Sequence, residues 1–329
     1  MIAWLQSLGA DQQVQLLFVT LSGLLLLVSA GAALHALKER GSLQEDTHQR
    51  FKLELRATWI GAMVFWAAWV SGPGGATLLF GAISFLALRE YIILLKTRRG
   101  DHRSLLLAFF VVLPLQYGLL ANRNFDLFSV FIPVYVFLAI PVVSALGGDP
   151  ERFLERNAKI QWGNMVCVYG LSHGPALVLL DFPKNQGRGA FLLFFLVMVV
   201  TVAKIAQTVA SRRLRRRPVA RHIDRSFSYR AWALGTVAAA LLGAALIWIT
   251  PFQAEQALAL AALAAAAGTL GEFVMSALKK DAGVRVWGNT SSVTGAVGLL
   301  DRVASLCLPR QCFSIRCAGT FSSSAELKP

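Results

Sequence analysis

Residues 257–302 read ALALAALAAAAGTLGEFVMSALKKDAGVRVWGNTSSVTGAVGLLDR, an Ala- and Leu-rich run that passes directly into a charged segment. The apolar part, Ala257–Leu278, is long enough to cross the hydrocarbon core of a bilayer, which takes about 20 apolar residues. The overlapping segment Met275–Arg302 carries two lysines, two aspartates and four glycines. The stretch therefore predicts a transmembrane helix that ends in a polar site at the membrane surface.

The rest of the chain has the same character. It has 329 residues, of which 56% are apolar, and a positive mean hydropathy. Residues 1–13 contain no Lys or Arg, so the first apolar run is expected to remain as a span rather than act as a signal peptide. We expect an all-α, polytopic membrane helical bundle. The apolar runs predict nine transmembrane helices, approximately Val14–Leu37, Ala57–Ser71, Ala76–Leu95, Ser104–Leu120, Asp126–Leu146, Ile160–Leu180, Gly189–Ala210, Ala231–Ile249 and Ala257–Leu278.

Positive charge alternates between the loops. The loops after helices 1, 3, 5 and 7, together with the C-terminal segment, hold 27 of the 32 Lys and Arg residues, and the other loops hold three. Because Lys and Arg collect in cytoplasmic loops, this asymmetry predicts an N-out, C-in topology with Met275–Arg302 on the cytoplasmic side. The net charge of +14 and the cluster Arg212–Arg217 then indicate contact with anionic lipid rather than with nucleic acid.

Ionisable groups inside predicted spans are costly at membrane depth and suggest function. Arg89 and Glu90 are adjacent near the cytoplasmic end of the third span. Instead of having a functional role, these side chains could extend to the membrane surface or pair with groups on other helices. His173 could equally hydrogen-bond a neighbouring helix. Lys204 lies about two turns from the end of the seventh span, with Gln207 on nearly the same face, and its stem can also reach the surface. A transporter is the function that such residues would otherwise suggest, but no inverted repeat supports it.

Lysines and carboxylates beside flexible glycine backbone are what a site for phosphates and a divalent metal requires. The segment 275–305 resembles the C-terminal signature of the bacterial phosphatidate cytidylyltransferase (CDP-diacylglycerol synthase) family. A second likeness covers Ser71–Tyr91, SGPGGATLLFGAISFLALREY, which includes a predicted turn at Gly72–Gly75. The matching signature residues are Ser276, Lys279, Lys280 and Asp281 in its first part, and Gly295, Gly298, Asp301, Arg302 and Ser305 in its second.

The resemblance implies an enzyme that makes CDP-diacylglycerol from CTP and phosphatidate, with Mg²⁺, and releases pyrophosphate. It implies catalytic roles for Asp281, Asp301 and Lys279. By the same resemblance Asp281, Asp301 and Glu272 would bind the metal. The substrate-binding residues would be Lys280, Arg302, Ser276, Gly295 and Gly298.

This sequence also departs from the family pattern. Glu272 stands where the family usually has Asp, and Lys204 aligns with an acidic residue, which reverses the charge. Ala296 and Ala304 replace a His and an Asp of the signature, and Asp224–Ala231 replaces a loop that holds a lysine and a glutamate. Two interpretations follow: an active enzyme with a rebuilt site, or a catalytically inactive relative that binds lipid or regulates a partner.

The resemblance extends over most of the chain, and we expect residues 1–307 to form a single membrane domain that includes the signature segment 275–305. Residues 308–329 are polar and lack helical periodicity. They are expected to form a disordered tail, or to derive from a frameshift. The implied partners are CTP, phosphatidate and membrane lipid, with a homodimer left open, and the implied location is the bacterial inner membrane.

Overall fold

The computed structural model describes residues 70–94, 98–179, 189–214, 219–220, 222–224, 227–246, 250 and 252–283, with scattered positions between 12 and 68. The chain divides into two compact units, residues 1–76 and 77–329. The described residues are helical and include no strand, which confirms the all-α prediction for this part of the chain.

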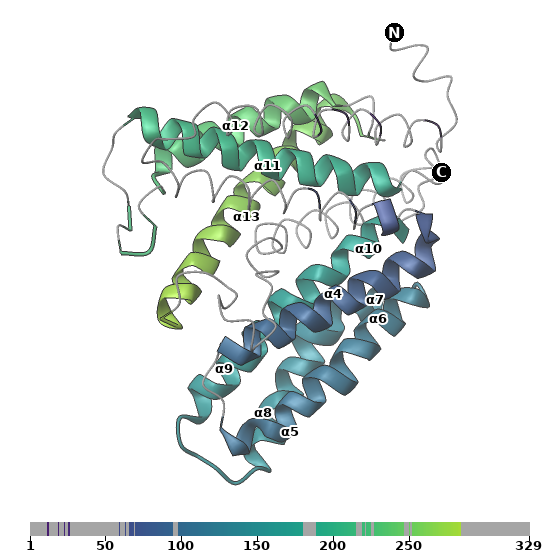
Figure 1. Cartoon of the computed structure of the whole chain (residues 1–329), viewed down its shortest axis with the longest axis vertical. Helices are drawn as coiled ribbons and strands as arrows, with labels where there is room; N and C mark the ends of the chain where they lie inside the picture. The colour runs from purple at the N-terminus through teal and green to yellow at the C-terminus, as the bar shows by residue number, and fades with distance from the viewer. Residues whose placement is uncertain are drawn as a thin grey trace, which may run out of the picture. The chain divides into compact units, whose positions relative to one another are not determined.

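The second unit contains most of the described helices (Figure 1). Several of them follow one another without a break and form longer continuous helices. The elements are α4 (Gly72–Leu94), η1 (Arg99–Asp101), α5 (His102–Leu107), η2 (Ala108–Val112), α6 (Leu113–Ala121), α7 (Phe125–Val130), η3 (Phe131–Val136), α8 (Phe137–Ala145), α9 (Phe153–Gly163), η4 (Asn164–Gly170), α10 (Leu171–Leu179), α11 (Gly189–Leu214), α12 (Tyr229–Ala245) and α13 (Ala254–Asp281).

Three of the long helices contain a π-helical segment, namely η2, η3 and η4. Proline lies inside or close to two of these segments: Pro133 is within η3, and Pro114 is the second residue of α6, which follows η2. Proline has no N–H and clashes with the carbonyl one turn earlier, so the backbone widens locally and the helix continues. The apolar runs that contain prolines therefore still form membrane-length helices.

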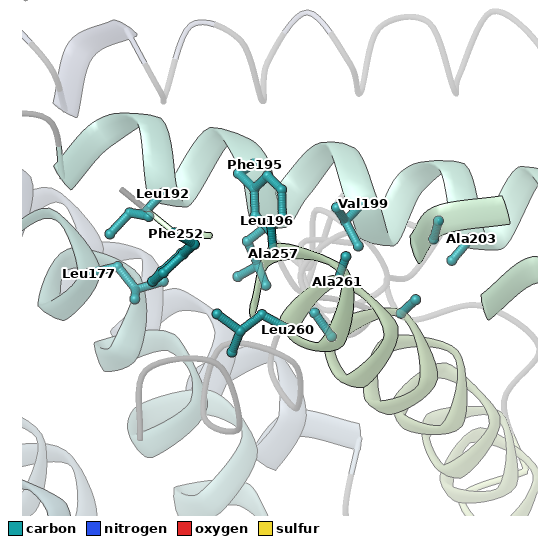
Figure 2. Packing of buried hydrophobic residues seen from close by; sticks show 13 residues of the cluster. Leu177, Leu192, Phe195, Leu196, Val199, Ala203, Phe252, Ala257, Leu260 and Ala261 are labelled. Atoms are coloured by element: carbon teal, nitrogen blue, oxygen red, sulfur yellow. The ribbon is translucent and has the colours of Figure 1, made fainter. Parts of the chain in front are cut away.

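Helices α11, α12 and α13 pack against one another, with α11 and α12 side by side and α13 crossing them (Figure 1). Small residues let the backbones approach, as is usual between membrane helices. A Cβ added at Gly243 of α12 would lie 2.3 Å from the Cβ of Ala261, and one at Gly235 would lie 2.7 Å from the carbonyl oxygen of Ala203. Figure 2 shows the buried core of this packing: Leu177, Leu192, Phe195, Leu196, Val199, Ala203, Ala239, Phe252, Ala257, Leu260, Ala261, Ala264 and Ala265.

Seven of the nine predicted spans fall within the described residues, and each is helical there. The spans predicted at Val14–Leu37 and Ala57–Ser71 lie largely outside the described residues. Among the described residues, five helices are long and apolar enough to cross a membrane: Gly74–Ile93, His102–Ala121, Phe125–Ala145, Phe191–Ser211 and Ala254–Asp281.

The outward faces of these helices carry large apolar side chains. Leu78 is 78% exposed, Phe110 is 68% exposed and Leu138 is 64% exposed. Apolar side chains exposed along helices of this length are suited to contact with lipid tails. The described part of the chain is therefore that of a membrane protein.

The predicted turn between the second and third spans was placed too far along the chain. The sequence suggested a turn at Gly72–Gly75, but α4 already begins at Gly72, where φ is +67°. Pro73 does not prevent this, because proline is tolerated in the first turn of a helix, where its missing N–H has no intrahelical partner. The break between the second and third predicted spans therefore lies at Ser71, whose hydroxyl donates to the carbonyl oxygen of Ala67 at 2.6 Å.

An ionic network joins the connection before α5 to the connection before α9. The Arg156 guanidinium is buried and lies 3.0 Å from the Asp101 carboxylate and 2.5 Å from that of Asp149. Arg98 pairs with Glu151 nearby, and both terminal nitrogens of its guanidinium donate to the carboxylate. The two connections, which carry the basic residues of the third and fifth loops, therefore lie at the same end of these helices.

Candidate functional site

Helix α13 positions the first half of the predicted site. Its Ala-rich sequence favours a helix, and Lys279 and Lys280 in its last turn complement the helix dipole. Thr269, Glu272, Ser276 and Lys279 are spaced by three, four and three residues, so they share one face. The Ser276 hydroxyl donates to the Glu272 carbonyl oxygen at 2.9 Å. We call this polar row, from Thr269 to Lys279, the α13 stripe.

Helix α11 brings a lysine to the α13 stripe. The Nζ atom of Lys204 lies 2.6 Å from Oε1 of Glu272, and both side chains are partly exposed, at 50% and 36%. The sequence left two roles open for Lys204: its side chain could extend to the membrane surface, or it could belong to a functional site. The structure shows that its ammonium is bound by a carboxylate of another helix.

A small recess, partly open to solvent, lies beside this ion pair. It is formed where α11 and α13 meet the segment before α12. Its lining combines charged, uncharged polar and aromatic side chains: Lys204, Gln207, Thr208, Asp224, Thr269, Glu272 and Phe273.

The end of α13 lies close to the loop that follows α11. The Lys280 ammonium donates to the carbonyl oxygen of His222. Lys279 is partly buried, whereas Lys280 and Asp281 are exposed in the last turn. Phe227 of the same loop packs its ring 4.5 Å from that of Phe273, at 33°. The loop therefore covers part of α13 between the recess and the lysines.

The structure brings together only part of the predicted site. Ser276, Lys279, Lys280 and Asp281 occupy consecutive turns at the end of α13. Glu272 lies nine residues before Asp281, which is about 13 Å along the helix axis, so both carboxylates cannot bind one ion directly. The other predicted residues lie outside the described residues, so their placement stays a prediction: Gly295, Gly298, Asp301 and Arg302.

The described residues offer few ligands for Mg²⁺. They contain no group of three or more His, Cys, Asp or Glu side chains that could hold a metal ion. The carboxylate of Glu272 is already engaged by the Lys204 ammonium. A divalent cation at Glu272 would lie beside that ammonium, which opposes binding by like-charge repulsion. The residues around Glu272 therefore do not fit Mg²⁺, and among the described residues Asp281 is the predicted ligand that stays accessible.

The sequence analysis missed four residues of the recess, Thr208, Asp224, Thr269 and Phe273. Two of them could have been found from spacing alone, because Thr208 follows Lys204 by four residues and Thr269 precedes Glu272 by three. Asp224 and Phe273 carried no such signal, since their position depends on how the loop folds back against α13.

His173 is another ionisable residue that the sequence singled out within a predicted span, and its ring is held by a backbone hydrogen bond and by aromatic packing. Its Nδ1 atom lies 2.7 Å from the Tyr169 carbonyl oxygen, and its ring packs 4.5 Å from the Tyr169 ring and 5.0 Å from that of Phe128. Glu90 is buried whereas the neighbouring Arg89 is exposed.

The helices, their apolar outer faces and the polar end of α13 define a helical integral membrane protein. Comparison with known proteins then gives the family. Residues 49–318 match the model of the cytidylyltransferase family. The chain is also 35% identical over 252 residues to YnbB of Escherichia coli (strain K12), itself described as uncharacterized, and the match covers 76% of this chain and 81% of the relative. The chain belongs to the cytidylyltransferase family, that is, the phosphatidate cytidylyltransferase family, as its signature segment had indicated.

Proposed function

We propose that the protein is a membrane-bound nucleotidyltransferase that makes CDP-diacylglycerol from CTP and phosphatidate. The observation that supports it best is the α13 stripe, which leads from the recess to Lys279, Lys280 and Asp281 in a chain of this family. A phosphate oxygen of phosphatidate attacks the α-phosphorus of CTP. The bond from the α-phosphorus to the oxygen that bridges to the β-phosphate breaks, and pyrophosphate leaves.

The described residues have defined tasks in this reaction. Lys279 and Lys280 carry positive charge at the end of α13, where it offsets the negative charge of the triphosphate and of the departing pyrophosphate. Asp281 and Asp301 are the proposed ligands of Mg²⁺, which would add to this charge compensation. Glu272 is left out of that set because its carboxylate is paired with Lys204. Ser276, Gly295, Gly298 and Arg302 complete the proposed substrate site.

The proposed topology has nine spans, with the N-terminus outside and the C-terminus inside, in the bacterial inner membrane. The asymmetry of Lys and Arg supports this orientation. The contact of Lys280 with His222 also supports it, because it places the loop after the seventh predicted span at the same end as the C-terminal signature. CTP would then reach the site from the cytoplasm and phosphatidate from the lipid.

The second candidate function is a catalytically inactive relative that binds lipid or regulates a partner. The Lys204–Glu272 ion pair favours it, because a lysine here neutralises a carboxylate that the family resemblance assigns to metal binding. The two candidate functions are distinguished by whether the protein catalyses the reaction.

A turnover assay separates them. Purified full-length protein in detergent is supplied with CTP, phosphatidate and Mg²⁺, and CDP-diacylglycerol and pyrophosphate are measured. We expect turnover in the wild type and its loss in Asp281→Asn and Asp301→Asn. The matched control is Asp126→Asn, an exposed aspartate in the first turn of α7, which should keep wild-type turnover. A folded wild type without turnover would establish the inactive relative instead.

A further inference from the structure

One charged side chain lies on the apolar outer face of α4. Arg89 is exposed, whereas the neighbouring Glu90 is buried, with an exposed fraction of 4%. Residues three or four positions away share the face of Arg89 on the helix. They are 39%, 49% and 43% exposed, and they are the apolar side chains Phe85, Leu86 and Ile93. The guanidinium therefore extends from a surface that is otherwise suited to lipid tails.

The position of Arg89 along α4 brings its guanidinium close to the membrane surface. Arg89 lies five residues before Leu94, the last residue of α4, which is about 7.5 Å along the helix axis. The connection that follows contains Lys96, Arg98 and Arg99, so this end of α4 is on the side of the membrane that carries the basic loops. The long side chain of an arginine at this depth reaches the level of the lipid headgroups.

The charge of Arg89 is not compensated within the described part of the chain, where this side chain makes no hydrogen bond or ion pair. Other arginines at the same end differ in this respect. Arg98 and Arg156 donate to carboxylates, and Arg103 donates to a backbone carbonyl oxygen. A guanidinium has five N–H donors, and leaving them unpaired beside hydrocarbon is costly. The hydrogen-bond partners of Arg89 therefore lie outside the described residues, in water or in lipid.

Helix α5 brings a second polar side chain to the same surface. The Phe85 ring of α4 meets the Phe109 ring of η2 edge to face, with their centroids 5.3 Å apart, so the chain reverses direction between these two helices. Arg89 follows Phe85 by four residues, and His102 precedes Phe109 by seven. His102, which is exposed, therefore lies about one helical turn nearer the membrane surface than Arg89. The two side chains flank one stretch of the outer face.

We infer that Arg89, with His102 beside it, binds the phosphate of an anionic phospholipid from the surrounding bilayer, as a structural lipid and not as a substrate. The planar guanidinium donates two parallel hydrogen bonds to two phosphate oxygens, and the acyl chains lie against apolar side chains such as Leu86. A zwitterionic lipid binds less well, because its own cation competes for the phosphate. The inference is independent of the proposed function, since such a lipid is not consumed.

The test measures the affinity of the full-length protein for phosphatidylglycerol in a nonionic detergent, by native mass spectrometry, with phosphatidylcholine of the same acyl chains for comparison. We expect Arg89→Gln to weaken phosphatidylglycerol binding roughly five- to tenfold, the effect of losing one charge-assisted contact at the membrane surface. Arg89→Lys should keep part of the affinity, because an ammonium retains the charge but not the planar fork. Binding of phosphatidylcholine should change little.

The matched control is Arg152→Gln. It removes one positive charge from the same end of the helices, but Arg152 is 69% exposed in the connection before α9 rather than on a lipid-facing helix. Salt screens such a charge, so this variant should change phosphatidylglycerol binding less than about twofold. Thermal unfolding midpoints equal to that of the wild type in lipid-free detergent show that the variants are folded.

The alternatives give different results. Equal losses in Arg89→Gln and Arg152→Gln would show a general attraction between the basic side and anionic lipid, and an unchanged affinity in Arg89→Gln would show that the guanidinium reaches only water. Either result overturns the inference. Loss of phosphatidate turnover in Arg89→Gln without loss of phosphatidylglycerol affinity would place Arg89 on the path of the substrate, and it overturns the inference too. A wild type that makes no CDP-diacylglycerol but shows the expected dependence on Arg89 keeps the lipid site and removes the proposed activity.

Discussion

The ammonium of Lys204 on α11 lies 2.6 Å from the carboxylate of Glu272 on α13. The pair joins two helices that also share the buried core of Figure 2, where Phe195 and Val199 of α11 meet Ala257 and Ala261 of α13. It also lines the recess, so it has two separable roles. It contributes to helix packing, and it contributes charge to the lining of the recess.

The contribution of this pair to stability is expected to be small. Both side chains are more than one-third exposed, and solvent-exposed ion pairs typically contribute about 0–1 kcal/mol. Lys204→Met, Glu272→Gln and the double variant should therefore lower the thermal unfolding midpoint only slightly, with a coupling energy below about 1 kcal/mol. A midpoint that falls steeply in either single variant and recovers in the double variant would show that the pair is a major structural contact.

A larger effect is expected at Arg156. Its guanidinium is 7% exposed and pairs with the Asp101 carboxylate, which is 3% exposed. Arg156→Ala would leave that carboxylate buried without its cation, a loss of about 3–5 kcal/mol. Arg152→Ala is the control, because Arg152 is 69% exposed and lies 4.0 Å from Glu155. Thermal unfolding in detergent checks both variants, and equal midpoints for the two would refute a structural role for the buried network.

The sequence predicted the helices well because each depends mainly on local composition. A run such as 189–210 can satisfy its backbone hydrogen bonds in a membrane only as a helix, whatever lies around it. Helix α13 runs three residues beyond the predicted span Ala257–Leu278, through Asp281, because Lys279 and Lys280 in its last turn complement the helix dipole.

The recess was predicted only in part, because it depends on contacts between segments far apart in the chain. The sequence indicated that Lys204 and Glu272 were unusual but not that they pair across 68 residues. Nothing local places Asp224 and Phe273 in the lining of one recess, because that arrangement requires the loop to fold back against α13. The turn at Gly72–Gly75 was misjudged for another reason: Gly and Pro favour turns, but both are also tolerated in the first turn of a helix.

Acid should weaken the Arg98–Glu151 contact. The hydrogen bond and charge of Arg98 hold the pKa of the Glu151 carboxyl below its usual value of 4.5. A lowered pKa in the folded protein means that the contribution to stability is complete above pH 4.5 and is lost as the pH falls through the folded-state pKa. The unfolding midpoint of Glu151→Gln should therefore lie below that of the wild type at pH 7, and the gap should close below pH 4.5.

A variant of Arg98 tests whether this residue is the cause of the lowered pKa of Glu151. Arg98→Gln breaks the same contact from the other side, so its difference from the wild type should close over the same pH range. The pKa of the Asp149 carboxyl is also lowered, mainly by the hydrogen bond from the Glu151 backbone and then by Arg156, and this contribution should persist in both variants. If the difference in unfolding midpoint between the wild type and either variant widened as the pH fell, the Arg98–Glu151 contact would not be its cause.

Because α12 packs closely against α13, we expect the stability of the protein to depend strongly on side-chain size at position 243. A Cβ there would lie 2.3 Å from the Ala261 Cβ, so the helices must separate to accept it. Gly243→Ala should therefore destabilise the protein by about 1–3 kcal/mol, as overpacking of a core does. Gly118→Ala in α6 is the matched control, because an added Cβ meets nothing within 4 Å and alanine favours a helix over glycine by about 1 kcal/mol. Thermal unfolding should show opposite shifts for the two substitutions, and a lower midpoint in both would mean that helix propensity and packing space do not govern these positions.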